Sequence, residues 1–506
     1  MNNTTGLNAW VRQTPNETAL LTPDGEYSWQ QVQRVVSQYQ LALVKAGVEK
    51  NTVVCLIGRA EPALLFAYLA CLAQGCLPVL VARQPVTGMN AKLTTLYSKS
   101  ERAYLWWCSD TALEWSASSF DRDVTFINTQ PIEGGCEHSE HEQAVNDDAI
   151  HGNVMHGNTI HDYAIHNNAI HELSPHQIAS IIFTSGSTGK PKAVVHTTEQ
   201  HLASATGLLE RFAFSPSDRW LLSLPMFHVS GLAIVWRWLS TGAQLKVGGG
   251  QFSEDISDVS HASLVVTQLK RIIDQRLPNQ LKRVLLGGSH ISNDLIQSAR
   301  ELGIDMWMGY GMTETASTVT AKQANEDASS GIPLPHREVK LIDGHIWVKG
   351  SVLSSGYYHQ GNILPLALVD GWFDTKDLGR WSAAQELQVI GRADNLFISG
   401  GENIHCEEIE AVLNARPEVV QSIVVPVRSD DYGARPVAVV QRVIDQVKLK
   451  NDQLDIDLTT TSLAKFKHPV AYYDMPESLL SSGIKVSRAQ VKSWLSSTQS
   501  NYVVIS

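Results

Sequence analysis

The chain has 506 residues, of which 43% are hydrophobic and 18% charged, and its formal net charge is −11 at pH 7. A chain of this length and apolar content can bury at least one large core and is long enough for two to four domains. The negative balance argues against a general affinity for nucleic acid or anionic lipid, although a local cationic pocket is compatible with it.

The N-terminal sequence MNNTTGLNAW has neither the basic start nor the apolar run of a signal peptide. The most apolar region, 53–82, is interrupted by polar residues and proline, and its longest clean run, 63–73, is too short to span a bilayer. The six cysteines contain no C-x-x-C pair, which favours reduced thiols over a disulfide framework or a zinc site. We therefore expect a cytoplasmic protein without membrane insertion, and the sequence leaves a homo-oligomer open.

Helix and strand signals alternate from the start of the chain. Ser28 and Gln31 have the S-x-x-Q form of a capping box, and apolar residues then repeat at helical spacing until Gly47. The following signals predict a strand at 52–57, a helix at 62–73 and a strand at 77–81. This alternation predicts an α/β fold with mixed or largely parallel sheets flanked by helices, and it resumes after residue 177.

Histidine repeats mark a segment of different character, which we take as an insertion at about 135–176. A histidine recurs every five residues at His151, His156, His161, His166, His171 and His176. Clustered imidazoles could collect divalent metal ions, whereas expanded short repeats are typical of solvated low-complexity insertions. A period of five matches neither one helix face nor one strand face, which favours the insertion.

A second change of character begins near Asp394, where we expect a large N-terminal domain, 1–393, to give way to a small α+β domain, 394–506. Residues 407–415 place Ile409, Val412 and Leu413 on one helical stripe. Residues 423–427 and 436–440 predict strands. This is enough for a separate small domain.

The stretch IIFTSGSTGKPKAVVHT, residues 181–197, looks at first like a phosphate-binding P-loop. A P-loop requires G-x-x-x-x-G-K-[ST], but Thr184 occupies the first glycine position and Pro191 follows Lys190. A strand at 180–183 leads instead into a loop whose amides and hydroxyls can encircle a triphosphate, with Lys190 and Lys192 adding positive charge. The loop residues are Thr184, Ser185, Gly186, Ser187, Thr188 and Gly189.

The loop resembles the phosphate-binding signature of the adenylate-forming superfamily, which contains acyl- and aryl-CoA synthetases, luciferases and adenylation domains of peptide synthetases. Seven further blocks match that pattern in order, at 225–231, 285–288, 309–314, 371–377, 391–394, 399–404 and 482–488. Stretches at 221–243, 261–269, 309–322, 337–340 and 482–488 are similar to the branch that activates o-succinylbenzoate for menaquinone synthesis. The resemblance implies an acid:CoA ligase that uses ATP, Mg²⁺ and coenzyme A.

In this superfamily a carboxylate attacks the α-phosphate of ATP, and the resulting acyl adenylate then meets a thiol. The first step joins two anions, so the site must supply cations and oriented dipoles. By resemblance, Glu314 coordinates magnesium, Thr313 contacts the phosphates, and the 184–192 loop holds the pyrophosphate. The same resemblance implies that His228 lines the acyl pocket, although a packed core histidine is the alternative reading.

Further site residues follow from the same resemblance. Asp377 is expected to accept both ribose hydroxyls, since an ionised carboxylate can do so in a bidentate way. Arg392 is expected to reach ribose or phosphate. The residues expected to flank the adenine and line the nucleotide site are Gly287, Gly288, Gly309, Tyr310 and Gly311.

The resemblance places the catalytic lysine of the small domain at Lys485, within SGIKVSR, and leaves Lys467 as a weaker candidate. Asp394 occupies the hinge position, and rotation there would bring Gly400 and Gly401 to the thiol path. The second carboxylate of an o-succinylbenzoate must be hydrogen-bonded or paired if buried. Four residues are candidates for that role, namely Ser230, Arg237, Thr267 and Ser289, whereas Trp236 and Trp238 are expected in the core.

Three rival functions remain open at this point. An aryl- or medium-chain acyl-CoA ligase would share every motif but present an uncharged acyl pocket. An adenylation domain serving a carrier protein would transfer its acyl group to protein-bound pantetheine, and no appended carrier or condensation module is visible in the sequence. A non-catalytic protein that binds metal through the histidine tract would need none of the nucleotide blocks.

Overall fold

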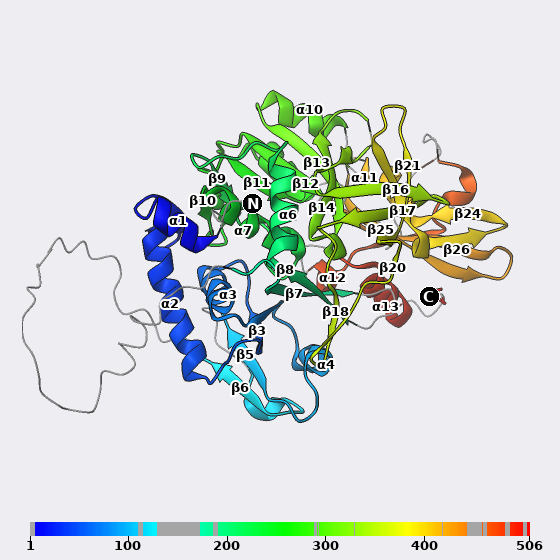
Figure 1. Ribbon diagram of the computed structural model, residues 1–506. Helices are drawn as coiled ribbons and strands as arrows, with labels where there is room; N and C mark the ends of the chain where they lie inside the picture. The colour runs from blue at the N-terminus through cyan, green and yellow to red at the C-terminus, as the bar shows by residue number, and fades with distance from the viewer. Residues whose placement is uncertain are drawn as a thin grey trace, which may run out of the picture.

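The computed structural model describes residues 6–109, 115–128, 173–185, 191–287, 291, 293–327, 329–416, 418–442, 458, 463–480, 486–498 and 503–505. The histidines from His151 to His171, and with them the two readings of that tract, lie outside the described residues. Helices and strands alternate along most of the described chain (Figure 1), which confirms the predicted α/β class.

The first elements follow the prediction closely. The capping box forms as expected, because the Ser28 side chain accepts from the Gln31 amide at the start of α2 (Trp29–Lys45). Next come β3 (Val53–Ile57), α3 (Pro62–Gln74) and β4 (Leu77–Val81), with β3 and β4 parallel. Helix α3 is buried over most of its length and carries the predicted apolar run. No helix among the described residues is long and apolar enough to cross a membrane.

Two large sheets form the greater part of the described chain. One sheet runs in the order β19 (Asn362–Leu364), β18 (Gly356–His359), β8 (Pro191–Thr197), β7 (Ile178–Ser185), β4, β3, β5 (Ala103–Trp107), β6 (Val124–Ile127). The other runs β15 (Ile332–Pro333), β14 (Ser317–Gln323), β13 (Asp305–Met312), β12 (Arg283–Gly287), β11 (His261–Leu264), β9 (Arg219–Leu221), β10 (Gln244–Lys246), β1 (Thr18–Thr22), β2 (Gly25–Ser28). Both sheets are mixed, with parallel interiors; their outer strands pair antiparallel except at β6, which pairs parallel with β5.

Helices and a smaller sheet complete this part of the molecule. The helices not yet named are α1 (Leu7–Gln13), α4 (Val86–Leu96), α6 (Thr198–Leu209), α7 (Val229–Thr241), α8 (Phe252–Asp255), α9 (Val266–Asp274) and α10 (Asn293–Glu301). The smaller sheet contains β16 (Arg337–Ile342), β17 (His345–Gly350), β21 (Trp372–Trp381), β20 (Leu368–Val369) and β22 (Leu387–Arg392). Strands β21 and β22 pair so that Asp377 lies opposite Arg392.

The main core lies between the two large sheets, where α2, α3, α6 and α7 bury their apolar faces. Trp29 of α2 stacks on Trp238 of α7 with ring centroids 5.0 Å apart, and the Trp238 indole donates to the Ala19 carbonyl at 3.0 Å. Trp236 is also buried and donates to the Tyr68 hydroxyl, so both tryptophans are core residues as predicted. Each large apolar side chain buried in this way contributes roughly 1.5–3 kcal/mol.

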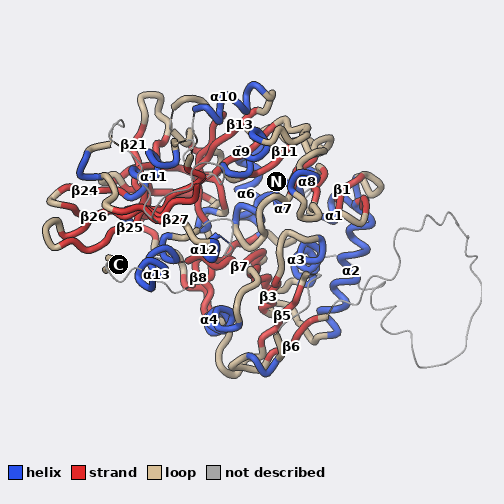
Figure 2. The backbone as a smooth tube through the Cα atoms, turned by 180° about the vertical axis from the view of Figure 1, so that it is seen from behind, coloured by secondary structure: helices blue, strands red, loops and turns tan. Residues whose placement is uncertain are grey.

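The C-terminal part has cores of its own, built from residues after Phe397. Its elements are β23 (Leu396–Ser399), β24 (Glu402–His405), α11 (Cys406–Asn414), β25 (Val419–Ser429), β26 (Gly433–Arg442), β27 (Ala471–Asp474), α12 (Glu477–Leu480) and α13 (Arg488–Thr498). Ile409 and Leu413 of α11 are buried against β25, as the predicted stripe requires. In Figure 2 this part lies at the opposite side of the molecule from α1 and α2. The predicted small α+β unit is therefore present, while its boundary at Asp394 stays a prediction.

Gly231, in the first turn of α7, is packed directly against backbone. A Cβ at this position would lie 2.1 Å from the Pro225 carbonyl oxygen and 2.5 Å from that of Leu224. We expect Gly231→Ala to lower the free energy of unfolding in urea by roughly 1–3 kcal/mol, because the preceding loop must move. Gly249→Ala is the matched control, since its Cβ would meet only Pro23 at an ordinary 3.5 Å. Equal losses in the two variants would contradict this interpretation.

Candidate functional site

A cavity of about 280 Å³ opens at the carboxyl ends of three parallel strands, β11, β12 and β13. The N-terminal turn of α7 and the start of β14 close its other sides. Ligands of open α/β sheets bind at such strand ends, because the loops that follow the strands can diverge there. The fold therefore places a ligand-sized space where a site is expected.

Many of the residues predicted for the site line this cavity. They are His228, Gly287, Gly309, Tyr310, Gly311 and Thr313, together with the carboxylate candidates Ser230 and Arg237. Thr267 lies on α9 and is not part of the lining, which weakens it as a candidate. Gly288 and Ser289 lie outside the described residues.

His228 is the residue that precedes α7, and its backbone is extended there. It is exposed and faces the cavity, and its ring lies 4.8 Å from that of Phe227. The alternative reading of a packed core histidine is therefore wrong.

Gly309 and Gly311 allow strand β14 to approach strand β13 closely. A Cβ at Gly311 would lie 1.7 Å from the Ser317 carbonyl oxygen, and one at Gly309 would lie 2.7 Å from the Thr320 carbonyl oxygen. The ladder shifts register between Tyr310 and Gly311, so the strand bends where the cavity begins. These two glycines are therefore required by the packing of the backbone itself.

The turn η2 (Thr313–Thr315) joins β13 to β14 and carries both predicted phosphate and metal residues. The Tyr357 hydroxyl donates to Glu314 Oε1 at 3.2 Å, and burial together with the Glu314 charge raises the pKa of Tyr357. Lys192 Nζ lies 5.3 Å from the centre of the Tyr357 ring. The aromatic ring thus stands between the lysine of the phosphate loop and the carboxylate of the turn.

The phosphate loop connects β7 to β8. The predicted strand at 180–183 is confirmed, but β7 continues to Ser185. Thr184 pairs with Lys192 of β8, so these two residues lie in the strand ladder and not in the loop as predicted. Ser185 pairs with Pro191 on the backbone, and residues 186–190, from Gly186 to Lys190, lie outside the described part of the chain. The roles of these loop residues therefore stay predictions.

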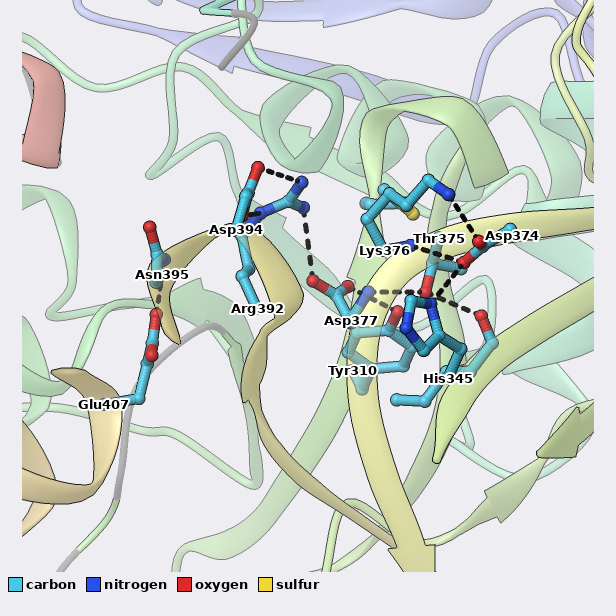
Figure 3. Close-up of polar contacts among 12 residues, drawn as sticks. Tyr310, His345, Asp374, Thr375, Lys376, Asp377, Arg392, Asp394, Asn395 and Glu407 are labelled. Atoms are coloured by element: carbon cyan, nitrogen blue, oxygen red, sulfur yellow. Dashed lines mark hydrogen bonds and ion pairs between the residues drawn. The ribbon is translucent and has the colours of Figure 1, made fainter. Parts of the chain in front are cut away.

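A second group of polar residues surrounds Asp377 (Figure 3). The Tyr310 hydroxyl donates to Asp377 Oδ2 at 2.6 Å, and Arg392 Nη1 donates to Asp377 Oδ1 at 3.2 Å. Arg392 also donates to both carboxylate oxygens of Asp394, from Nε at 2.8 Å and from Nη2 at 3.1 Å. The structure therefore joins the cavity residue Tyr310, the predicted ribose ligand Asp377 and the predicted hinge residue in one network.

Electrostatic effects at this network oppose one another. Burial raises the pKa of Asp377, and the hydrogen bond from Tyr310 and the charge of Arg392 only partly offset it. Burial lowers the pKa of Arg392, but the bonds to Asp394 and the charge of Asp377 more than compensate, so its pKa is raised. The folded protein thus holds Asp377 in surroundings that disfavour its charged form, which is a common property of groups at functional sites.

Arg237 is a buried cation whose guanidinium lines the cavity. Its Nη1 donates to the Ser263 hydroxyl at 3.3 Å and its guanidinium carbon lies 5.1 Å from the Trp220 ring centre. Its Nε has no hydrogen-bond partner, and no carboxylate pairs with it, among the described residues. Burial and the charge of Arg337 lower the pKa of Arg237 to about 9, so the side chain is still charged at pH 7.

The predicted residues of the C-terminal part lie away from the cavity lining. Gly400 and Gly401 form the turn between β23 and β24, where the Gly400 amide donates to the Tyr432 carbonyl. Lys467, the weaker lysine candidate, donates to both oxygens of Glu408 at 2.7 and 2.6 Å. Lys485 lies outside the described residues, so its role stays a prediction.

Several residues at the site were not assigned from the sequence. Ser263 and Thr318 line the cavity, and both fall in stretches that carried the resemblance. Tyr357 lies far along the chain and reaches Glu314 only because β18 pairs with β8, so no local signal marks it. His196 bonds to the Thr313 carbonyl across 117 residues, which no spacing rule predicts.

Comparison with known proteins adds independent information. Residues 7–358 match the protein family described as AMP-binding enzyme. The 2-succinylbenzoate–CoA ligase of Haemophilus influenzae is 36% identical over 486 residues, covering 95% of each chain. That of Salmonella typhimurium is 45% identical over 320 residues, covering 63% of this chain and 69% of that protein. The solved structure of a variant of E. coli MenE with bound OSB-AMS is 34% identical, with a TM-score of 0.78 and 97% of each chain covered.

Removing the charge of Asp377 and removing that of Asp374, both on β21, are expected to change the thermal stability at pH 7 in opposite directions. A carboxyl whose pKa is raised by folding weakens stability as pH rises through that pKa, whereas a lowered one strengthens it above the unfolded pKa. Asp377→Asn should therefore keep or raise the melting temperature at pH 7, with the gain shrinking toward pH 4. If Asp377 accepts the ribose hydroxyls as predicted, the change should also weaken ATP binding roughly ten- to hundredfold, because that charged acceptor is lost.

Asp374→Asn is the control, measured by the same thermal unfolding and ATP titration. Despite opposing burial, Lys376 and His345 lower the pKa of Asp374, so this variant should lose stability at pH 7 and keep ATP affinity. Equal loss of ATP binding in both variants would contradict the assignment of Asp377.

Proposed function

The chain belongs to the AMP-binding enzyme family, and we propose that it is the member that activates o-succinylbenzoate, also named 2-succinylbenzoate, for menaquinone biosynthesis. It is an AMP-forming acid:CoA ligase whose substrates are o-succinylbenzoate, ATP and coenzyme A. The ligases of Haemophilus influenzae and Salmonella typhimurium carry this activity in their names, and the first aligns along almost the whole chain.

The reaction has two balanced steps. In the first, a carboxylate oxygen of the acid attacks the α-phosphorus of ATP, the bond to the β-phosphate oxygen breaks, and pyrophosphate leaves. In the second, the coenzyme A sulfur attacks the acyl carbon of the adenylate, the bond from that carbon to the phosphate oxygen breaks, and AMP leaves. Both steps gather negative charge, so they require cations and oriented donors around the α-phosphorus in the first step and around the acyl carbon in the second.

The single observation that carries the choice of acid is the buried Arg237. A guanidinium in an apolar wall is costly unless an anion pairs with it, and no protein carboxylate does so among the described residues. The activated carboxyl must stay near the nucleotide, so a second carboxylate on the same molecule is the natural partner. Arg237 lies on α7 with the Ser263 hydroxyl beside its guanidinium, and this placement suits a substrate that carries a second carboxylate.

The nucleotide residues follow from the network around Asp377. We assign the ribose hydroxyls to the Asp377 carboxylate, the adenine to the surface formed by Gly287, Gly309 and Tyr310, and ribose or phosphate to Arg392. All three residues line the cavity, and the lack of side chains at the two glycines and the face of the tyrosine ring support the adenine assignment. Thr313 lies next to the phosphates in this arrangement.

Magnesium fits the donor set at turn η2. Glu314 offers a carboxylate, the hard oxygen ligand that Mg²⁺ prefers, and the Tyr357 hydroxyl occupies only one of its two oxygens. An ion held by Glu314 would supply positive charge that offsets the negative charge of the phosphates. Tyr357 orients the carboxylate, and Lys192 adds positive charge on the side of the phosphate loop.

Lys485 is assigned as the mobile cation of the adenylation step. Arg488, three residues later, is held at the start of α13 by Glu407 and by the Val424 carbonyl, which anchors the segment that follows the lysine. Rotation about Asp394 would exchange Lys485 for the Gly400–Gly401 turn and open a path for the thiol. The cytoplasm is the proposed location, and a homo-oligomer remains compatible with it.

Substrate choice is tested by pyrophosphate release with o-succinylbenzoate, benzoate and octanoate. We expect o-succinylbenzoate to be preferred, because only this acid can pair with the Arg237 guanidinium. Arg237→Met should lower kcat/KM for o-succinylbenzoate at least ~30-fold, since loss of one partner of a buried ion pair costs about 2 kcal/mol or more. The same change should affect benzoate little, and wild-type preference for benzoate or octanoate would overturn the choice of acid.

The lysine assignment is tested by separating the two half-reactions. Lys485→Ala should slow pyrophosphate release at least ~100-fold, because a cation is lost where two anions meet. Thioester formation from added acyl adenylate should be much less affected. Lys467→Ala is the matched control, since Lys467 is paired with Glu408 and should keep both half-reactions. Full adenylation rate in the Lys485 variant, with loss in the Lys467 variant, would reverse the assignment.

A further inference from the structure

Turn η2 is held in place by side chains that come from a different part of the fold. His196, the last residue but one of β8, contacts the Thr313 carbonyl oxygen through Nε2 at 2.7 Å. Ser204 of α6 donates its hydroxyl to the Ala316 carbonyl oxygen at 2.5 Å. These two carbonyls stand at the two ends of the turn that presents Thr313 and Glu314.

The turn needs such support because its backbone is strained. Ala316 has a φ of 49° and Ser317 a φ of 101°, a region that residues other than glycine seldom occupy. Strained backbone at functional sites persists only where the surroundings fix it. The bonds from His196 and Ser204, with the Ser354 amide donating to the Glu314 carbonyl at 2.8 Å, provide that fixation.

The ring of His196 is itself fixed by a buried stack. It lies 4.9 Å from the ring of His201, which stacks on Trp236 at 5.1 Å with an interplanar angle of 7°. His201 Nε2 is 2.8 Å from the Ser180 hydroxyl oxygen on β7. Both histidines are buried, so their rings cannot turn without disturbing the core between the sheets.

The proton on His196 follows from its partner. A carbonyl oxygen only accepts, so Nε2 carries the hydrogen and Nδ1 is bare. Nδ1 has no hydrogen-bond partner among the described residues, and burial lowers the pKa of His196 to about 4 against the opposing bond to Thr313. His196 is therefore a neutral imidazole whose Nε2–H donates to the Thr313 carbonyl, while its buried Nδ1 has no hydrogen-bond partner among the described residues.

We infer that His196 is a positioning residue for adenylation, which acts by holding the Thr313 carbonyl so that turn η2 presents Thr313 and Glu314 to the phosphates of ATP and to magnesium. This inference rests on the proposed function of those two residues. Errors of about 1 Å in such groups lower rates by roughly a hundredfold, so a support that fixes the turn affects catalysis without touching substrate. Ser204 supports the other end of the turn in the same way.

The test compares variants that keep or remove the donor. His196→Met fills a similar volume without a donor, and we expect kcat for pyrophosphate release to fall at least ~10-fold with a higher KM for Mg·ATP. The KM for o-succinylbenzoate should change less than threefold, because Arg237 is untouched. His196→Gln places an amide N–H near the position of Nε2 and should restore kcat to within about threefold of wild type.

His261→Met is the matched control. His261 is also buried, and its Nε2 contacts the Ala213 carbonyl at 2.9 Å, but Ala213 belongs neither to turn η2 nor to the cavity lining. This variant should lose comparable thermal stability and keep the KM for Mg·ATP. If His196→Met misfolds, Ser204→Ala removes the second support by deleting one hydroxyl and should still raise that KM about threefold or more.

The outcomes separate this inference from the proposed function. Wild-type enzyme that releases no pyrophosphate with any acid of the panel would overturn the function itself. Active wild type with unchanged kinetics in folded His196→Met would overturn only the inference, as would a Gln variant as impaired as the Met variant. If His196→Met cannot be purified, unchanged kinetics in Ser204→Ala would overturn the inference instead.

Discussion

Buried positive charge with no carboxylate hydrogen-bonded to it among the described residues is the constraint on which the site depends. Arg237 lines the cavity with its Nε unpaired, and Arg337 is buried with all three guanidinium nitrogens lacking hydrogen-bond partners among the described residues. Burial lowers the pKa of Arg337 to about 9, so it too is charged at pH 7. Burying such a charge lowers the stability of the protein, and a bound anion would offset that loss. A chain with a net charge of −11 thus has a locally cationic interior around Arg237 and Arg337.

Local features of the fold were predictable because they depend on neighbouring residues. The capping box at Ser28 and the buried helix α3 formed where the sequence predicted them, and the strand predicted at 180–183 is present within the longer β7. The α/β class followed from the alternation of these signals. The division into sheets did not, because β14 and β8 change direction relative to their neighbours and no short pattern encodes that.

The sequence predicted many residues of the site but not the contacts between them. The resemblance supplied Tyr310, Asp377 and Arg392 separately, whereas their shared network arises from the pairing of β21 with β22 and the approach of β13. His196 could not be found from the sequence, since its partner is 117 residues away and buried histidines usually serve the core. Arg237 could be named only as one of four candidates, and burial in the cavity wall distinguishes it.

The position of β6 at the end of its sheet has a consequence for how the gene can change. An edge strand has a neighbour on one side only, and among the described strands β6 pairs with β5 alone. The entropic cost of closing a connection rises only with the logarithm of its length. Duplication of short codon repeats between β6 and β7 therefore adds little to the free-energy cost of folding. For the same reason, we expect an epitope or fluorescent reporter inserted at this connection to be tolerated.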